Sequence, residues 1–190
     1  MNQNTNKLIK ISLLSAIAFI LMYLEFPVIP LFPWLKIDLS DVPALLGAFG
    51  FGPLAGVLIE LIKNVLIILL KGSSSGLVGE VANFLVGISL VLPASFIYHK
   101  NKSKKNAILG MLVGTICMEI LGIISNVYFL LPAYGMHMDT AQALQYITVG
   151  LIPFNGIKCL MVSILTYLLY KKVSVSIFKV ESNFGKTETI

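Results

Sequence analysis

Charged residues are scarce in this chain of 190 residues. They make up 12% of it, whereas hydrophobic residues make up 57%, and the mean hydropathy is +0.90. Ordinary soluble domains carry about 25% charged residues, so this composition excludes that class. The length suffices for a single membrane domain, residues 1–190, with several spans of about 20 apolar residues each. We therefore expect an all-α integral membrane protein.

Motifs for nucleotide hydrolysis and for common hydrolytic chemistry are absent as well. No G-x-x-x-x-G-K-[ST] loop occurs, so the chain should not hydrolyse ATP by itself. His99 and His137 fall in loops, and neither H-E-x-x-H nor an Asp/His metal motif is present. The basic residues behind the net charge of +5 form short clusters between apolar runs, which argues against nucleic acid as a partner. The sequence favours a protein that is not an enzyme and holds no cofactor or metal.

Apolar segments organise the chain. Five are long enough to cross about 30 Å of hydrocarbon, namely 8–29, 53–70, 77–98, 106–131 and 144–170. Lysine-rich sites at the N-terminus, at 99–105 and from Lys171 onwards should be cytoplasmic. An even number of crossings must separate the first two sites, so the short segment 42–51 is predicted to cross too. This gives a six-helix transmembrane bundle in the cell membrane with both termini in the cytoplasm.

The connection between the first two spans, residues 30–41, is apolar but contains Pro30 and Pro33. Proline lacks an N–H and restricts its predecessor, so a continuous helix is excluded. We expect an ordered external loop over the bundle, with Trp34 at the membrane interface. Before the fourth span, the serines at 73–75 are expected to cap the helix.

Polar side chains inside the spans are candidates for function, because each ionised group costs about 2.5–3.5 kcal/mol at a span centre. Three consecutive spans bring a set of them towards the outer side: Glu80, Asn83, Asn126, Asn155 and Lys158. Carboxamides match the amide-like edge of a heterocycle, and the aromatic rings of Phe154, Tyr128 and Tyr146 can stack on it. The pattern predicts a site for a polar ligand that arrives from outside.

Structural pairing is the alternative for the ionisable residues. Lys158 can contact a ligand or form an ion pair with Glu80 or Glu119, and we weigh the two roles equally. Glu60 and Lys63 are three residues apart, so they can neutralise each other on one helix face.

Three stretches carry a family resemblance: 38–53 (DLSDVPALLGAFGFGP), 60–64 (ELIKN) and 72–84 (GSSSGLVGEVANF). They resemble the riboflavin-specific substrate-binding (S) component of energy-coupling factor (ECF) transporters, in particular a staphylococcal member, and the resemblance extends over about residues 8–172. It implies a six-helix bundle whose external loop covers a riboflavin pocket, with riboflavin as transported ligand. The substrate residues it implies are Glu80, Asn83, Asn155 and Lys158. Asn126, Tyr128, Phe154 and Leu39 are added from their positions.

The resemblance also implies partners, namely a transmembrane coupling subunit and two ATPase subunits. Members dock through small residues at A-x-x-x-A spacing, since small side chains let helices approach closely. The nearest equivalent here is Ser12, Ala16 and Ala18. Three alternatives stay open: the same architecture for another vitamin such as thiamine or biotin, a self-sufficient permease, and a membrane enzyme.

Overall fold

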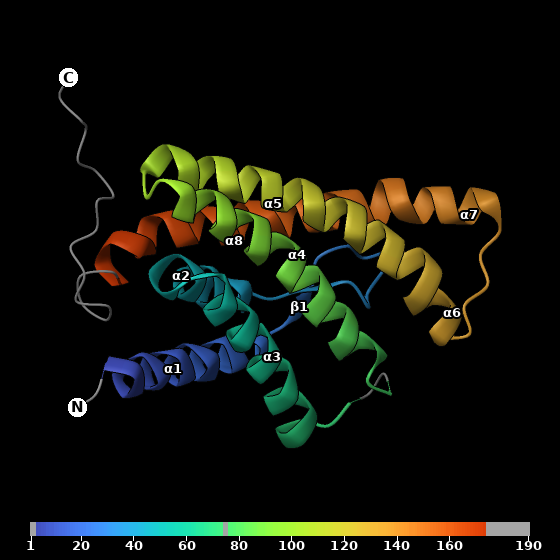
Figure 1. Ribbon diagram of the computed structural model, residues 1–190. Helices are drawn as coiled ribbons and strands as arrows, with labels where there is room; N and C mark the ends of the chain where they lie inside the picture. Colours follow the sequence, from blue (N-terminus) through green and yellow to red (C-terminus); the bar gives the residue numbers. More distant parts are fainter. Residues whose placement is uncertain (1–2, 74–75, 174–190) are drawn as a thin grey trace.

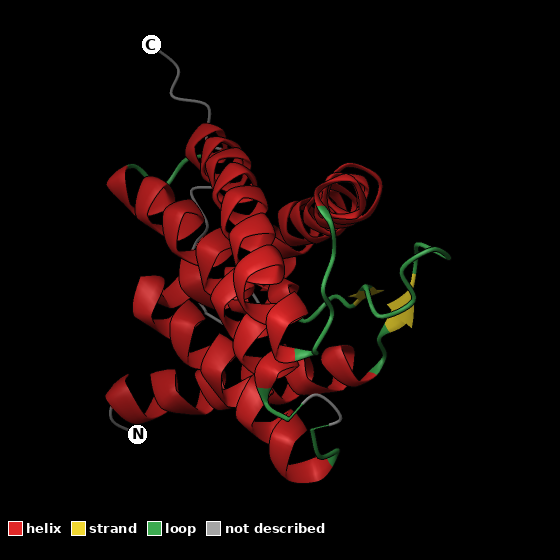
Figure 2. Ribbon diagram, turned by 90° about the vertical axis from the view of Figure 1, so that its right-hand side faces the viewer, coloured by secondary structure: helices red, strands yellow, loops and turns green. Residues whose placement is uncertain are grey.

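The computed structural model describes residues 3–73 and 76–173, which form a helical bundle (Figures 1 and 2). Its elements, with η for π-helix, are α1 (Gln3–Tyr23), β1 (Phe26–Pro27), β2 (Lys36–Ile37), α2 (Asp41–Phe51), α3 (Pro53–Leu70), α4 (Val78–Lys100), α5 (Lys104–Ser125), η1 (Asn126–Leu130), α6 (Leu131–Ala133), α7 (Thr140–Gln145), η2 (Tyr146–Leu151) and α8 (Ile152–Val173). Within the described ranges, five stretches are long and apolar enough to cross a membrane: Asn4–Tyr23, Pro53–Leu70, Val78–Lys100, Lys104–Ala133 and Thr140–Tyr170. The predicted helical architecture and its five long apolar segments are confirmed.

The first helix is shorter than the predicted span 8–29, because α1 ends at Tyr23. Pro27 cannot continue a helix, and it biases Phe26 towards extended backbone. Instead the chain forms β1, which pairs antiparallel with β2 in the register Phe26 to Ile37 and Pro27 to Lys36. This small hairpin fixes both ends of the loop that precedes α2.

The segment predicted at 42–51 is the helix α2. Its 11 residues span about 16 Å at 1.5 Å per residue, roughly half the hydrocarbon thickness. Residues 41–49 are all buried, and α2 contacts α1, α3, α4 and α8. At its end Gly52 has a φ of +105°, which favours glycine, and Pro53 begins α3 in the first turn, where its missing N–H costs nothing. Protein, not lipid, therefore encloses this short helix.

The lysine-rich sites gather at one end of the bundle. The start of α1, the connection between α4 and α5, and the end of α8 lie at the left of Figure 1, opposite the connection between α6 and α7. At the lysine-rich end, the rings of Phe49, Tyr98 and Tyr170 pack together, with centroids 4.6 Å apart for Phe49 and Tyr98 and 5.8 Å apart for Phe49 and Tyr170. The hydroxyls of Tyr98 and Tyr170 share a hydrogen bond of 2.8 Å. This aromatic cluster fills the bundle interior there.

The candidate docking residues on α1 divide into two groups. Ser12 and Ala16, one turn apart, are exposed. Ala18 is fully buried in the hydrophobic core. Only Ser12 and Ala16 therefore face outward, because Ala18 lies on the side of α1 that packs inside the bundle.

Candidate functional site

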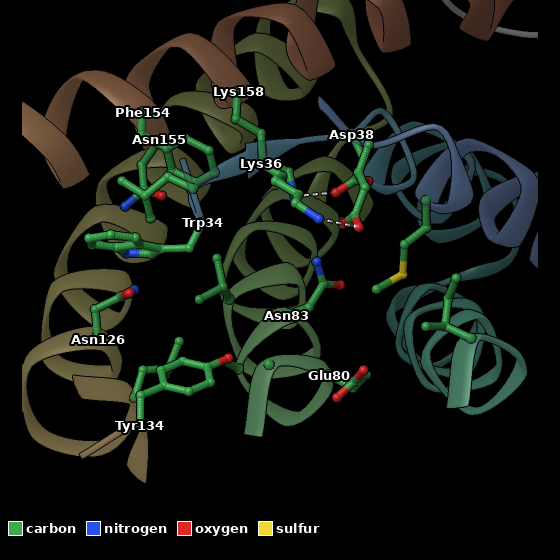
Figure 3. A pocket seen from close by; sticks show the side chains of 18 of the residues that line it. Trp34, Lys36, Asp38, Glu80, Asn83, Asn126, Tyr134, Phe154, Asn155 and Lys158 are labelled. Carbon is green, nitrogen blue, oxygen red and sulfur yellow. Dashed lines mark hydrogen bonds and ion pairs between the residues drawn. The ribbon is translucent and has the colours of Figure 1, made fainter. Parts of the chain in front are cut away.

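A cavity of about 390 Å³ opens between the β1–β2 hairpin, the end of α3, the start of α4, the α5–η1 region and α8. This volume falls in the range of about 300–1,000 Å³ that is typical of small-molecule sites. Figure 3 shows Asn83 and Glu80 on one side of the opening, with Trp34, Asn126 and Tyr134 opposite. Six of the eight predicted substrate residues line this cavity: Glu80, Asn83, Asn126, Phe154, Asn155 and Lys158.

The other two predicted residues do not line the cavity. Tyr128 in η1 is 71% exposed and points away from the bundle interior. It lies two positions from Asn126, and residues at that spacing do not share a helix face, so both cannot face inward. Leu39 packs against the hydrophobic core, while its neighbour Asp38 faces the cavity.

The amides of Asn126 in η1 and Asn155 in α8 are held in place by specific partners. Asn126 donates from Nδ2 to the Gly122 carbonyl at 2.9 Å and accepts at Oδ1 from the Tyr146 hydroxyl at 2.9 Å. Asn155 donates to Oε2 of Glu119 at 3.3 Å. A Cβ added to Gly122 would lie 2.8 Å from Nδ2 of Asn155, so glycine here leaves the space that this amide occupies.

An aromatic group joins the loop between β1 and β2 to η2. The Phe32 ring packs edge-on against Trp34 and Tyr146, with centroid distances of 5.6 and 5.0 Å. Trp34 also donates from Nε1 to the Tyr146 hydroxyl at 3.4 Å. Gly150 in η2 permits this packing, because a Cβ there would lie 2.8 Å from the Phe32 ring. Trp34 thereby lines the cavity, a role that its predicted place at the membrane interface did not indicate.

Lys158 has ion-pair partners other than those considered from the sequence. Its Nζ lies 3.2 Å from Oδ2 of Asp38 and 3.1 Å from Oδ2 of Asp41. The predicted partners Glu80 and Glu119 are wrong: in the described part of the chain, Glu80 accepts from the Ser73 hydroxyl at 2.8 Å, and Glu119 accepts from the Asn155 amide. The loop that folds back over the bundle brings Asp38 to Lys158 across 120 residues.

Two shorter-range predictions concern the neighbouring helices. The ion pair between Glu60 and Lys63 is confirmed at 2.7 Å. Ser73 accepts a hydrogen bond from the Leu77 N–H at 2.7 Å just before α4, but the N-cap position of this helix is Leu77, which forms no side-chain cap, so Ser73 does not fill the predicted capping position. Ser74 and Ser75 lie outside the described residues.

Charged residues also surround the cavity mouth. Oε1 of Glu25 lies 3.0 Å from Nζ of Lys36 and 2.9 Å from Nζ of Lys71, and Lys71 sits over the Tyr23 ring at 5.1 Å. Partial burial raises the pKa of Glu25, but the hydrogen bonds and positive charges of the two lysines outweigh it and hold this pKa below its usual range. These contacts tie the β1–β2 hairpin to the end of α3.

Comparison with known proteins places this arrangement in a family. The family described as "ECF transporter, substrate-specific component" matches residues 6–170. The chain belongs to this family of S components. Among its relatives, this S component is 46% identical to the riboflavin transporter RibU of Staphylococcus aureus (strain TCH60), over 90% of this chain and 92% of RibU. It is 42% identical to the riboflavin transporter FmnP of Bacillus subtilis (strain 168), over 88% and 91% of the two chains.

Solved structures agree with the family assignment. A structure of the S component of a bacterial ECF transporter superposes with a TM-score of 0.78 at 44% identity, covering 90% of this S component and 97% of the other chain. ThiT from Listeria monocytogenes gives a TM-score of 0.60 at 20% identity, covering 93% and 99%, which shows the shared fold alone.

Proposed function

We propose that this S component captures riboflavin from outside the cell and presents it for uptake, without catalysing a reaction on it. A transmembrane coupling subunit and two ATPase subunits supply the energy. The proposal is supported by the two relatives named as riboflavin transporters, each matched over more than nine-tenths of its length. It is also supported by the family match and by the chemistry of the cavity.

One observation carries the proposal: a single cavity combines amides, an ion pair and aromatic rings. The amides are Asn83, Asn126 and Asn155, the ion pair is Asp38 with Lys158, and the rings include Trp34 and Phe154. Amides and ammonium groups offer the donors and acceptors that the polar edge and ribityl hydroxyls of riboflavin require. The flat isoalloxazine ring gains from burial against the aromatic and apolar walls.

The orientation in the membrane follows from the lysine-rich end. Short lysine-rich segments remain in the cytoplasm, so the start of α1, the α4–α5 connection and the end of α8 lie inside the cell, and the cavity mouth faces outward. In this arrangement α2 completes the set of six transmembrane helices in the cell membrane. Ser12 and Ala16 on the outer face of α1 leave space for a close helix contact with the coupling subunit.

A titration of the purified S component with riboflavin tests the proposal, with quenching of flavin fluorescence as the signal. We expect a Kd well below about 1 μM, because the ligand buries a large ring in a preformed cavity. Thiamine and biotin serve as competitors. Micromolar or weaker binding of riboflavin, or displacement by either competitor at equal concentration, contradicts the proposal.

A second experiment tests the dependence on partners. Riboflavin uptake is measured in cells that express the chain with or without the coupling and ATPase subunits. We expect uptake only in their presence, since the sequence contains no nucleotide-binding loop of its own. Uptake by the chain alone identifies it as a self-sufficient permease.

A further inference from the structure

A buried group of charged residues lies behind the cavity wall. Asp41, Glu60 and Lys63 are each 0% exposed, and none of them lines the cavity. They come from α2 and α3, and they meet the two cavity-lining residues Asp38 and Lys158. We call these five residues the buried charge cluster. In Figure 3, a dashed line joins Lys158 to Asp38 at the cavity wall.

Lys63 fixes the inner part of the cluster. Its Nζ donates to the Ser40 hydroxyl at 2.7 Å and to Oδ1 of Asp41, and it lies 2.7 Å from Oε2 of Glu60. Two hydrogen bonds and one ion pair therefore fix the position of this ammonium group. Asp41 is therefore held by one carboxylate oxygen and cannot turn without breaking a contact to Lys63.

The second oxygen of Asp41 reaches the cavity wall. Oδ2 lies 3.1 Å from Nζ of Lys158, whose other carboxylate neighbour is Asp38 at 3.2 Å. Asp38 is in turn held by the Ser40 N–H, which donates to its Oδ1 at 2.8 Å. Two fixed carboxylates thus set the place of the Lys158 ammonium, and a ligand in the cavity can touch only one of them.

Stability alone does not account for such a cluster. Replacement of buried ion pairs by well-packed hydrophobic residues is often neutral or stabilising, since desolvation offsets the attraction between the charges. Lys158, by contrast, needs a charged neighbour to remain at an apolar cavity wall, and it needs a fixed position to recognise a ligand. Asp41 lies behind the cavity wall, where a ligand cannot displace it, so it meets both needs.

We propose that Asp41, anchored by Lys63, is a positioning residue that holds the Lys158 ammonium at the cavity wall in the geometry required for high-affinity binding of riboflavin. The inference rests on the proposed function. It assigns to a residue outside the cavity an effect on ligand affinity that is transmitted through Lys158.

Asp41→Asn is the central variant, because it keeps the shape of the side chain and leaves each of the two lysines with one acidic neighbour. Lys63 keeps its contact with Glu60, and Lys158 keeps its contact with Asp38. We expect riboflavin affinity to fall by about 10-fold, an effect within the range measured for residues in contact. Ser95→Ala is the matched control: this buried hydroxyl donates to the Ala48 carbonyl of α2, away from the cluster, so its loss should change stability and leave affinity unaltered.

A double-mutant cycle separates positioning from a general structural effect. Lys158→Met and the pair Asp41→Asn/Lys158→Met complete the cycle, and the pair removes one charge of each sign. If Asp41 acts through Lys158, the pair binds riboflavin no more weakly than Lys158→Met alone. If the affinity losses of the two single variants multiply in the double variant, the inference is overturned. It is also overturned if Asp41→Asn binds riboflavin with wild-type affinity.

The absorption spectrum of bound riboflavin provides a measurement that does not require Lys158→Met to fold. A displaced ammonium changes the field at the ring, so the visible bands of riboflavin bound to Asp41→Asn should shift from those in the wild type. Weakened affinity with an unchanged spectrum contradicts the inference. Absence of riboflavin binding by the wild type overturns the proposed function itself, whereas tight binding by both wild type and Asp41→Asn overturns only the role of Asp41.

Discussion

Tyr146 donates its hydroxyl hydrogen to Oδ1 of Asn126 at 2.9 Å and thereby joins the two π-helical segments, η1 and η2. The same hydroxyl accepts from Nε1 of Trp34 at 3.4 Å, so one oxygen links the loop, η2 and η1. Single π-turns within long helices are frequent at functional sites, because they redirect side chains that a regular helix would place elsewhere. Here they orient an amide and a phenol towards each other.

Tyr146→Phe should weaken riboflavin binding several-fold and cost about 1 kcal/mol of unfolding free energy, the usual net contribution of one hydrogen bond. The ring and its packing on Phe32 remain, so the loss falls on the orientation of Asn126 and Trp34. Fluorescence titration and thermal unfolding measure the two effects. Unchanged affinity would show that Asn126 does not need this partner.

Gly122→Ala should reduce riboflavin affinity, because the new methyl group would lie 2.8 Å from Nδ2 of Asn155 and displace that amide. Gly156→Ala is the matched control beside the same amide: its Cβ would meet only Oε1 of Glu119, at an ordinary 3.8 Å. Titrations of both variants with riboflavin should show a loss for Gly122→Ala alone. Equal losses of affinity in the two variants would show that a general change in helix packing, and not displacement of Asn155, is the cause.

Glu25→Gln should loosen the cavity mouth, since it removes the charge that Lys36 and Lys71 share. These pairs are partly exposed, so the stability loss should be at most about 1 kcal/mol. The pKa of Glu25 is lowered in the folded protein, so its contribution is present above the pKa of an unpaired glutamate, about 4.3, and is lost as the pH falls through the lower folded value. Thermal unfolding of both proteins against pH should show a difference at neutral pH that disappears in acid. A difference that grows in acid would contradict this sign.

Tyr98→Phe should lower stability by about 1–2 kcal/mol, because it leaves the buried Tyr170 hydroxyl without this 2.8 Å hydrogen bond. Riboflavin affinity should remain at the wild-type value, since neither tyrosine lines the cavity. Unfolding and binding measurements on the same preparation test both statements. A large loss of affinity would connect the aromatic cluster to the site.

The sequence predicted most of the helical framework, because long apolar runs leave little choice of structure in lipid. It placed the end of α1 six residues too late, since apolar content continues through Phe26 to Ile29 although Pro27 already blocks the helix. Asn126 and Asn155 were found because an amide is conspicuous inside a span. Their position in one cavity depends on helix packing, which a list of spans does not specify.

The remaining site residues depended on contacts distant in the chain. Asp38 meets Lys158 across 120 residues, so local spacing could not reveal the pair, and the acidic residues of nearby helices looked equally suitable. Tyr128 was predicted to line the site together with Asn126, although residues two positions apart on a helix face in different directions. Nothing in the sequence indicated that Glu25, Lys36 and Lys71 lie at the cavity mouth, because charged residues outside the spans are ordinary.

The aromatic cluster of Phe49, Tyr98 and Tyr170 closes the interior of the described bundle at one end. Packed rings fill the lysine-rich end, and none of these three residues lines the cavity. A ligand that left the cavity through that end would first have to separate the three rings.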